Sequence, residues 1–398
     1  MKRVFFLGMF LPLAGVVMAQ SGKKSLNDAY GAYSNGYYDK AKTHIDKCIE
    51  FDDTKADAKT WLYRGNIYLM IESMKMTKDS NRYKNLCDYC GETAFDAYME
   101  ANRIDPKVEV TTMSIRTPRK GLEFCADVLV NHVFDAIARR DNERAYQLAK
   151  KAYTANSKNE RAIYFLGLTA GFLEKNDEAK ARYSELVKMK SKNMYAYMSL
   201  SEIYKKEDDK KNAELVLEEG APMFLRDTFI MDYATTYVSI MSWVGKNEKV
   251  IEVVEKGLQK DPKNYYLLIS YGLAVLDEKK YEEAEGYFKR ALEISPADVV
   301  ANYNMGYCYF QNALDKFEER DKLPLNDEES YERLKAEEKA LYEKARPYVE
   351  KAYELDNNDI PTLTMLQKIY ARSGASDEET LKKATEVGEK LNALRKKE

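Results

Sequence analysis

Residues 265–296, YYLLISYGLAVLDEKKYEEAEGYFKRALEISP, decide the fold of this chain. Within them, Gly272 is followed by Ala284, Phe288, Ala291 and Pro296, at offsets of 12, 16, 19 and 24 residues. The same skeleton returns upstream and downstream at a spacing close to 34 residues. A fixed period of that size is typical of a helix pair that cannot bury its apolar face alone and must stack on its neighbours. The sequence therefore predicts an all-α repeat array.

The 265–296 unit is the seventh of the array, and another clear unit, the second, lies nearer the N-terminus. Its small, aromatic and proline positions are Trp61, Gly65, Tyr68, Ala94, Tyr98, Ala101 and Pro106. Small residues are expected where the two helices of a pair cross, because a close crossing leaves no room for a longer side chain. The proline ends the second helix, because its ring cannot continue the hydrogen-bond ladder. Weaker copies fill most of the remaining chain, among them the unit that runs through Ala145, Ala149 and Ala152.

This order of small and aromatic residues resembles the tetratricopeptide repeat (TPR), over roughly residues 24–372. The resemblance implies a right-handed superhelix, or solenoid, of antiparallel helix pairs, with about eight to nine repeats between residues 20 and 398. A final amphipathic helix, at about 379–395, has one apolar stripe that suits it to closing the open end. The segments Trp61–Tyr68 and Leu323–Leu325 are also similar to those of secreted or periplasmic TPR proteins of Bacteroidetes.

Two insertions interrupt the period, at about residues 71–91 and 312–341. The second contains Leu323-Pro324-Leu325 and then a charged stretch of helical propensity, which predicts extended helices joined at a proline turn. Insertions in repeat proteins often gather on a binding face. The equally weighted alternative is that they only lengthen a helical hairpin.

The N-terminus has the pattern of a cleavable signal peptide at residues 1–19. Lys2 and Arg3 precede a 14-residue apolar run, Val4–Val17, and small residues predict cleavage after Ala19. A membrane anchor is the rival interpretation, but 14 residues span only about 21 Å of a hydrocarbon core about 30 Å thick. We expect a periplasmic or secreted protein without a transmembrane span in the mature chain.

The charge balance disfavours a nucleic-acid partner. Without residues 1–19, the chain keeps 61 of its 63 Lys and Arg against 66 Asp and Glu, a net charge of −5. These charges are mixed along the sequence, whereas nucleic-acid binding requires a basic face.

The TPR resemblance implies where a ligand would bind, because the first helix of each repeat lines the concave face. The matching positions in this sequence are Tyr164, Leu168, Tyr195, Met198, Tyr266, Ile269, Leu273, Tyr303, Tyr307 and Phe310. Such an apolar, tyrosine-rich groove suits an extended protein segment or an amphipathic helix. The alternative is that each of these side chains packs against the next repeat, as aromatic stripes at helical spacing commonly do.

Five cysteines follow the signal segment. Cys48 and Cys308 fall at packing positions, where we expect buried thiols. Cys87 and Cys90 form a C-x-x-C pair, for which a bridge between them, or from either one to Cys125, is expected in an oxidising compartment. We expect no zinc site, because further ligands at matched spacing are missing from the sequence.

No catalytic motif or cofactor fingerprint occurs in the sequence, which holds only two histidines. The leading hypothesis is therefore a non-catalytic, cofactor-free scaffold of the cell envelope that binds a protein or peptide. Two alternatives remain open at this stage. One is a thiol- or metal-dependent activity at Cys87 and Cys90, and the other is a self-assembling structural element.

Overall fold

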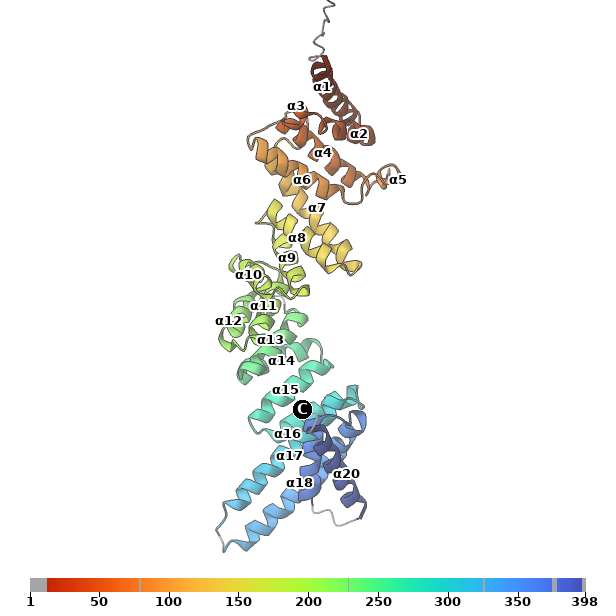
Figure 1. Ribbon diagram of the computed structural model, residues 1–398. Helices are drawn as coiled ribbons and strands as arrows, with labels where there is room; N and C mark the ends of the chain where they lie inside the picture. The colour runs from red at the N-terminus through yellow and green to blue at the C-terminus, as the bar shows by residue number, and fades with distance from the viewer. Residues whose placement is uncertain (1–12, 79, 228, 325, 374–377, 396–398) are drawn as a thin grey trace, which may run out of the picture. The chain divides into compact units, whose positions relative to one another are not determined.

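The computed structural model describes residues 13–78, 80–227, 229–324, 326–373 and 378–395 (Figure 1). All regular secondary structure within those ranges is helical, so the predicted all-α repeat fold is confirmed. A helix that could cross a membrane is not found there, since each one is too short or too polar. Residues 1–12 of the expected signal segment lie outside the described residues, and that segment stays a prediction.

The chain divides into two compact units between Ala196 and Tyr197, inside α11 (Met194–Lys206). The sequence predicts a single array, and repeat arrays lack a common core because each helix pair packs only on its neighbours. The helices of the first unit are α1 (Leu13–Ser34), α2 (Tyr38–Cys48), α3 (Asp52–Lys55), α4 (Ala58–Met74), α5 (Ser80–Tyr83), α6 (Cys90–Ile104), α7 (Pro118–Ala138), α8 (Asn142–Ala155), α9 (Glu160–Phe172) and α10 (Asn176–Lys188).

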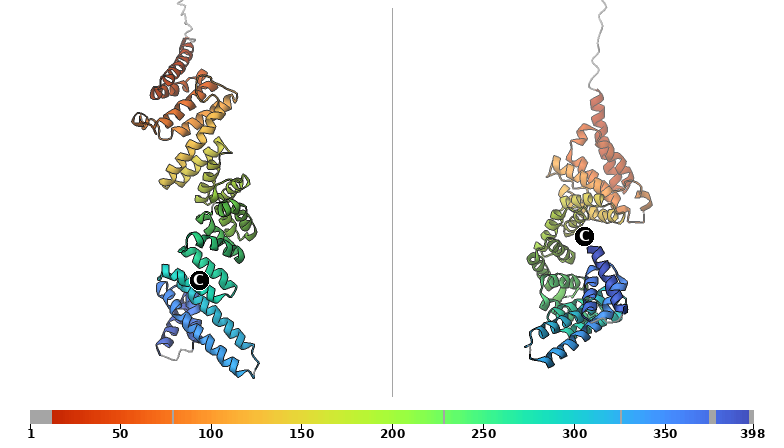
Figure 2. Two further views of the ribbon diagram at one scale, coloured as in Figure 1. Left: turned by 180° about the vertical axis from the view of Figure 1, so that it is seen from behind. Right: turned by 60° about the horizontal axis from the view of Figure 1, so that its bottom comes forward.

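In the first unit, α1 packs on α2, α4 on α6, α7 on α8 and α9 on α10 (Figures 1 and 2). The predicted first insertion holds the end of α4, the short helix α5 and the start of α6. The long helix α7 is the first helix of its pair, and the repeat pattern does not predict it. Its start carries a local signal, because Thr117 caps it by accepting from the Lys120 N–H and Pro118 occupies its first turn.

The second unit continues with four further pairs. After α12 (Lys210–Ala221) and the π-helical turn η1 (Pro222–Asp227), its helices are α13 (Met231–Val244), α14 (Asn247–Lys260), α15 (Tyr265–Asp277), α16 (Tyr281–Ile294), α17 (Val299–Asp321), α18 (Glu328–Leu355), α19 (Ile360–Arg372) and α20 (Glu378–Arg395). The pairs are α13 with α14, α15 with α16, α17 with α18 and α19 with α20.

The stretch at 265–296 shows why small residues recur in each pair. Gly272 of α15 lies against the Phe288 ring of α16, and a Cβ on this glycine would meet the ring at 2.5 Å. Gly306 of α17 and Val349 of α18 repeat the contact, at 2.4 Å from such a Cβ. Only a residue without a side chain allows the two helices to approach this closely.

Residues 312–341, the predicted second insertion, belong to the far half of a long hairpin. α17 has 23 residues and α18 has 28, against 13 in α15, and their tip extends beyond the neighbouring helices of the unit (Figures 1 and 2). Pro324 lies in the turn between them. At the end of the unit, α20 packs on α19 and buries Val387 and Leu391, while Leu381 stays 53% exposed.

Candidate peptide-binding surfaces on the first helices

Aspartate caps set the starts of the two helices that enclose the main candidate site. The Asp298 carboxylate accepts from the Ala301 N–H at 2.8 Å and begins α17. The Asp359 carboxylate does the same for Thr362 at 2.8 Å and begins α19. These two helices are the first helices of successive pairs, so the faces that they turn away from their own partner helices lie next to each other.

A groove of about 340 Å³ lies between these faces, and we call it the α17–α19 groove. Its lining is mainly aromatic and aliphatic, with one cation. The lining residues are Tyr303, Tyr307, Phe310, Gln311, Leu314, Ile360, Pro361, Thr364, Met365 and Lys368. Three of them, Tyr303, Tyr307 and Phe310, are positions that the repeat pattern selects as ligand contacts.

Tyr303 and Tyr307 form the tyrosine wall of the groove. Their rings are 6.0 Å apart and within 9° of parallel, and both side chains are half-buried. Burial is the main cause that raises the pKa of Tyr303, and the nearby Tyr307 and Asp359 raise it further. Its phenol therefore stays neutral at physiological pH and presents a hydroxyl to a ligand. Phe310, only 4% exposed, forms the floor and packs its ring 5.7 Å from that of Tyr342.

The remaining predicted contacts of the second unit are less uniform. Met198 is half-buried on α11. Tyr266 and Leu273 are exposed on α15, two helices before the groove. Ile269 is buried, at 7% exposed, so it belongs to the packing of its helix pair and not to an open surface.

The first unit carries a second aromatic surface, made of Phe134, Tyr164, Phe165 and Tyr195. Its rings follow one another over three first helices, with centroids 4.4 Å apart for Phe134–Phe165, 5.2 Å for Phe165–Tyr164 and 6.4 Å for Tyr164–Tyr195. Phe134 and Tyr195 are nearly half exposed, and the predicted contact Leu168 is half-buried on the same helix as Tyr164.

Sequence reasoning misses Phe134 because it does not find α7. It also misses Ile360 and Met365, which complete the groove from α19. The start of α7 could have been recognised from Thr117-Pro118, but the facing of α17 and α19 depends on tertiary packing.

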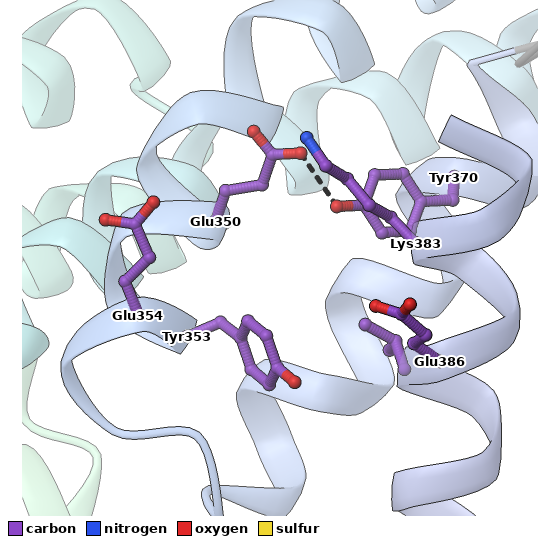
Figure 3. A pocket seen from close by; sticks show the side chains of 7 residues that line it. Glu350, Tyr353, Glu354, Tyr370, Lys383 and Glu386 are labelled. Carbon is purple, nitrogen blue, oxygen red and sulfur yellow. Dashed lines mark hydrogen bonds between the residues drawn. The ribbon is translucent and has the colours of Figure 1, made fainter. Parts of the chain in front are cut away.

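Another concavity, of about 250 Å³, lies among α18, α19 and α20 (Figure 3). Its lining residues are Glu350, Tyr353, Glu354, Tyr370, Lys383, Glu386 and Val387. The Tyr370 hydroxyl donates to Glu350 at 2.7 Å, the dashed contact in Figure 3. Lysines of the chain itself interact with its acidic and aromatic groups. Lys351 pairs with Glu354, and Lys390 lies over the Tyr353 ring. We therefore assign it no ligand.

The cysteines fall into one bridge and three thiols. Cys87 and Cys90 form a disulfide, which leaves Cys125 as a buried thiol, and Cys48 and Cys308 are buried as expected. Burial raises the pKa of the Cys48 thiol to about 11, so it is protonated and unreactive at neutral pH.

Comparisons with known proteins point to one family. Residues 245–299, which contain the stretch 265–296, match the family described as tetratricopeptide repeat. A comparison with curated protein sequences gives no match.

Several solved structures are similar to this chain at low identity. MamA from Desulfovibrio magneticus RS-1 is 18% identical with a TM-score of 0.37, covering 52% of this chain and 98% of its own. A TPR repeats protein from Bacteroides fragilis is 19% identical with a TM-score of 0.29, covering 62% and 98%. YrrB, titled a TPR protein with an unusual peptide-binding site, is 17% identical with a TM-score of 0.32, covering 60% and 90%. At these scores the likenesses carry no argument about this chain.

Two observations identify the type of repeat. One is the sequence match over residues 245–299, and the other is the close glycine-to-aromatic or glycine-to-valine crossing that returns from pair to pair. Together they show a tetratricopeptide repeat at residues 245–299 and the same kind of close helix crossing in other pairs of the described chain.

Proposed function

We propose that the protein is a non-catalytic scaffold that binds a protein or peptide segment in the α17–α19 groove. One observation carries the proposal: three positions selected by the repeat pattern, Tyr303, Tyr307 and Phe310, line a single cavity of about 340 Å³. TPR proteins bind protein or peptide partners, and the TPR match at residues 245–299 supports the same class of ligand here.

The lining defines what the bound segment must offer. Tyrosine rings and aliphatic side chains favour apolar anchors, and the phenol hydroxyls accept or donate hydrogen bonds at the wet rim. Lys368 is the one charged side chain of the lining, so charge alone does not select the ligand. An extended segment or an amphipathic helix with aromatic or aliphatic anchors spaced by a turn fits this surface.

We also propose that the scaffold works in the cell envelope, and the N-terminal sequence is the support. Charge followed by an apolar run and a small-residue site directs export. Fractionation and N-terminal sequencing of the native protein should give a periplasmic or secreted chain that begins at Gln20. A chain recovered in the cytoplasm with Met1 or Lys2 at its start would refute the export proposal.

Site-directed photocrosslinking in intact cells tests the groove. A photoreactive residue at Gln311, inside the groove, should capture a discrete partner, whereas the same residue at exposed Glu329 should not. The double variant Tyr303→Ala/Tyr307→Ala should lose the capture. Tyr331→Ala is the matched control, because Tyr331 is an exposed tyrosine of α18 that does not line the groove. Capture that survives the double variant, or that occurs mainly from Glu329, would move the site to the hairpin.

A further inference from the structure

The two sulfurs of the Cys87–Cys90 disulfide differ in their surroundings. Cys90 is the first residue of the 15-residue helix α6 and is fully buried. Cys87 lies in the preceding turn and is partly exposed. An attacking thiolate from solvent therefore reaches the sulfur of Cys87, and the sulfur of Cys90 becomes the leaving group.

A lysine binds the backbone of the turn that carries the pair. The Lys75 ammonium donates to the carbonyl oxygen of Cys87 at 2.7 Å and to that of Asp88 at 3.1 Å. The sulfur of Cys90 is 3.7 Å from the same Cys87 oxygen. The ammonium and the sulfur thus share one neighbouring atom. A cation and a helix N-terminus both stabilise a thiolate, so Cys90 is placed to leave as an anion.

The turn that carries the pair is held by contacts other than the disulfide. The Tyr89 ring contacts His132, at 5.1 Å between ring centroids, and the Arg144 guanidinium, at 4.7 Å. His132 in turn contacts Glu72 at 2.9 Å, and Glu72 pairs with Lys75 at 3.0 Å. The two cysteines are therefore kept near each other when the bond is open, which favours its closure again.

A purely structural role explains this disulfide less well. The bond closes a loop of only four residues, and a cross-link gains most by closing a long loop. The same insertion is already joined to the first pair by Arg82 with Asp39 and by the Tyr83 hydroxyl to the Gly36 carbonyl.

We propose that Cys87 and Cys90 form a thiol–disulfide exchange site that accepts electrons from a thiol-bearing partner. The partner thiolate attacks the Cys87 sulfur and forms a mixed disulfide, while the bond between Cys87 and Cys90 breaks and Cys90 leaves as a thiolate. A second thiolate of the partner then attacks the mixed disulfide and releases Cys87. The partner gains a disulfide, and the pair takes up two electrons and becomes two thiols. This site is separate from the α17–α19 groove and does not rest on the function proposed for it.

Reduced glutathione is the probe that tests the exchange in the full-length oxidised protein. The expected result is that glutathione opens the bond without unfolding and that peptide mapping finds the mixed disulfide on Cys87. Lys75→Met should slow the opening by about three- to tenfold, since leaving-group stability enters the rate only in part. Lys75→Arg, which keeps the cation, should restore most of the rate. Lys84→Met is the matched control, an exposed lysine in the same insertion, and should match the wild type.

Two cysteine variants give an independent readout if the Lys75 variants fold poorly. With oxidised glutathione, Cys90→Ser should form a mixed disulfide on Cys87, whereas Cys87→Ser should leave the buried Cys90 unmodified. Circular dichroism shows whether each variant is folded. Opening that requires urea, glutathione on Cys90, or equal rates for Lys75→Met and Lys84→Met would each overturn the proposal.

Discussion

The rings of Tyr303 and Tyr307 lie 6.0 Å apart and within 9° of parallel, one helical turn apart on α17. Residues four apart on a helix share a face, so both rings turn toward the same side of the helix. Across from them, α19 supplies Ile360 and Met365. The tyrosine wall, the Phe310 floor and the α19 side chains together form the groove.

Phe310 and Tyr307 should differ strongly in their effect on stability. Phe310→Ala removes a buried ring and should lower the free energy of unfolding by about 3–5 kcal/mol, because it leaves a cavity. Tyr307→Ala removes a half-buried side chain and should lower it by about 1 kcal/mol or less. Urea unfolding followed by circular dichroism measures both. Equal losses would mean that Tyr307 belongs to the core and that the groove has no tyrosine wall.

The crossing at Gly272 should not tolerate one added methyl group. Gly272→Ala places a Cβ at 2.5 Å from the Phe288 ring, so the helices must shift, at about 1–3 kcal/mol. Gly286 on α16 is the matched control, since nothing lies within 4 Å of its added Cβ. Gly286→Ala should raise stability by about 0.5–1 kcal/mol through helix propensity. Thermal unfolding compares the two, and two variants of equal stability would contradict the close crossing.

A buried carboxylate joins the hairpin to α19. Glu338 is 6% exposed and binds both Arg320 of α17 and, at 3.7 Å, Arg372 of α19. The Phe317 ring lies beneath both guanidinium groups, at 5.1 and 4.5 Å. Glu338→Ala leaves two cations without their shared anion and should cost about 3–5 kcal/mol in the free energy of unfolding.

Its neighbour Glu337 provides the control for that measurement. Glu337 is a partly exposed carboxylate that pairs with Lys316 and Arg333. Glu337→Ala should change stability by less than about 1 kcal/mol, because water screens exposed pairs. A loss at Glu337 as large as that at Glu338 would show that burial does not set the strength of this network.

The pH dependence of stability should include a contribution from Glu92. Burial raises the pKa of this carboxyl, but hydrogen bonds from Arg144 and Lys151 outweigh it and hold the pKa below its ordinary value of 4.5. A lowered folded-state pKa stabilises the fold above the unfolded value, and this contribution is lost as the pH falls through the folded-state pKa. The wild type should therefore exceed Glu92→Gln in stability at pH 7, with the difference shrinking below about pH 4.5. A difference that stays constant from pH 7 to pH 3 would contradict the assignment.

The sequence by itself determined the repeat. The helix crossing can be predicted from Gly272, Phe288 and their equivalents, because both partners of each contact lie within one unit of about 34 residues. The long hairpin of α17 and α18 also follows from local signals, namely uninterrupted helical propensity and a proline between two charged stretches. Such information is contained in a short window, so a single sequence is enough to recover it.

Only the tertiary structure decided which helix faces stay open and what meets there. Tyr303 and Ile269 occupy equivalent-looking ligand positions, yet the first is half-buried in a groove and the second is packed in the core. The convergence of Lys75 on the Cys87 carbonyl, and of Arg372 on Glu338, likewise depends on how α4, α6, α18 and α19 pack. Exposure and proximity are properties of the packed helices, whereas the repeat pattern fixes only what each helix contributes.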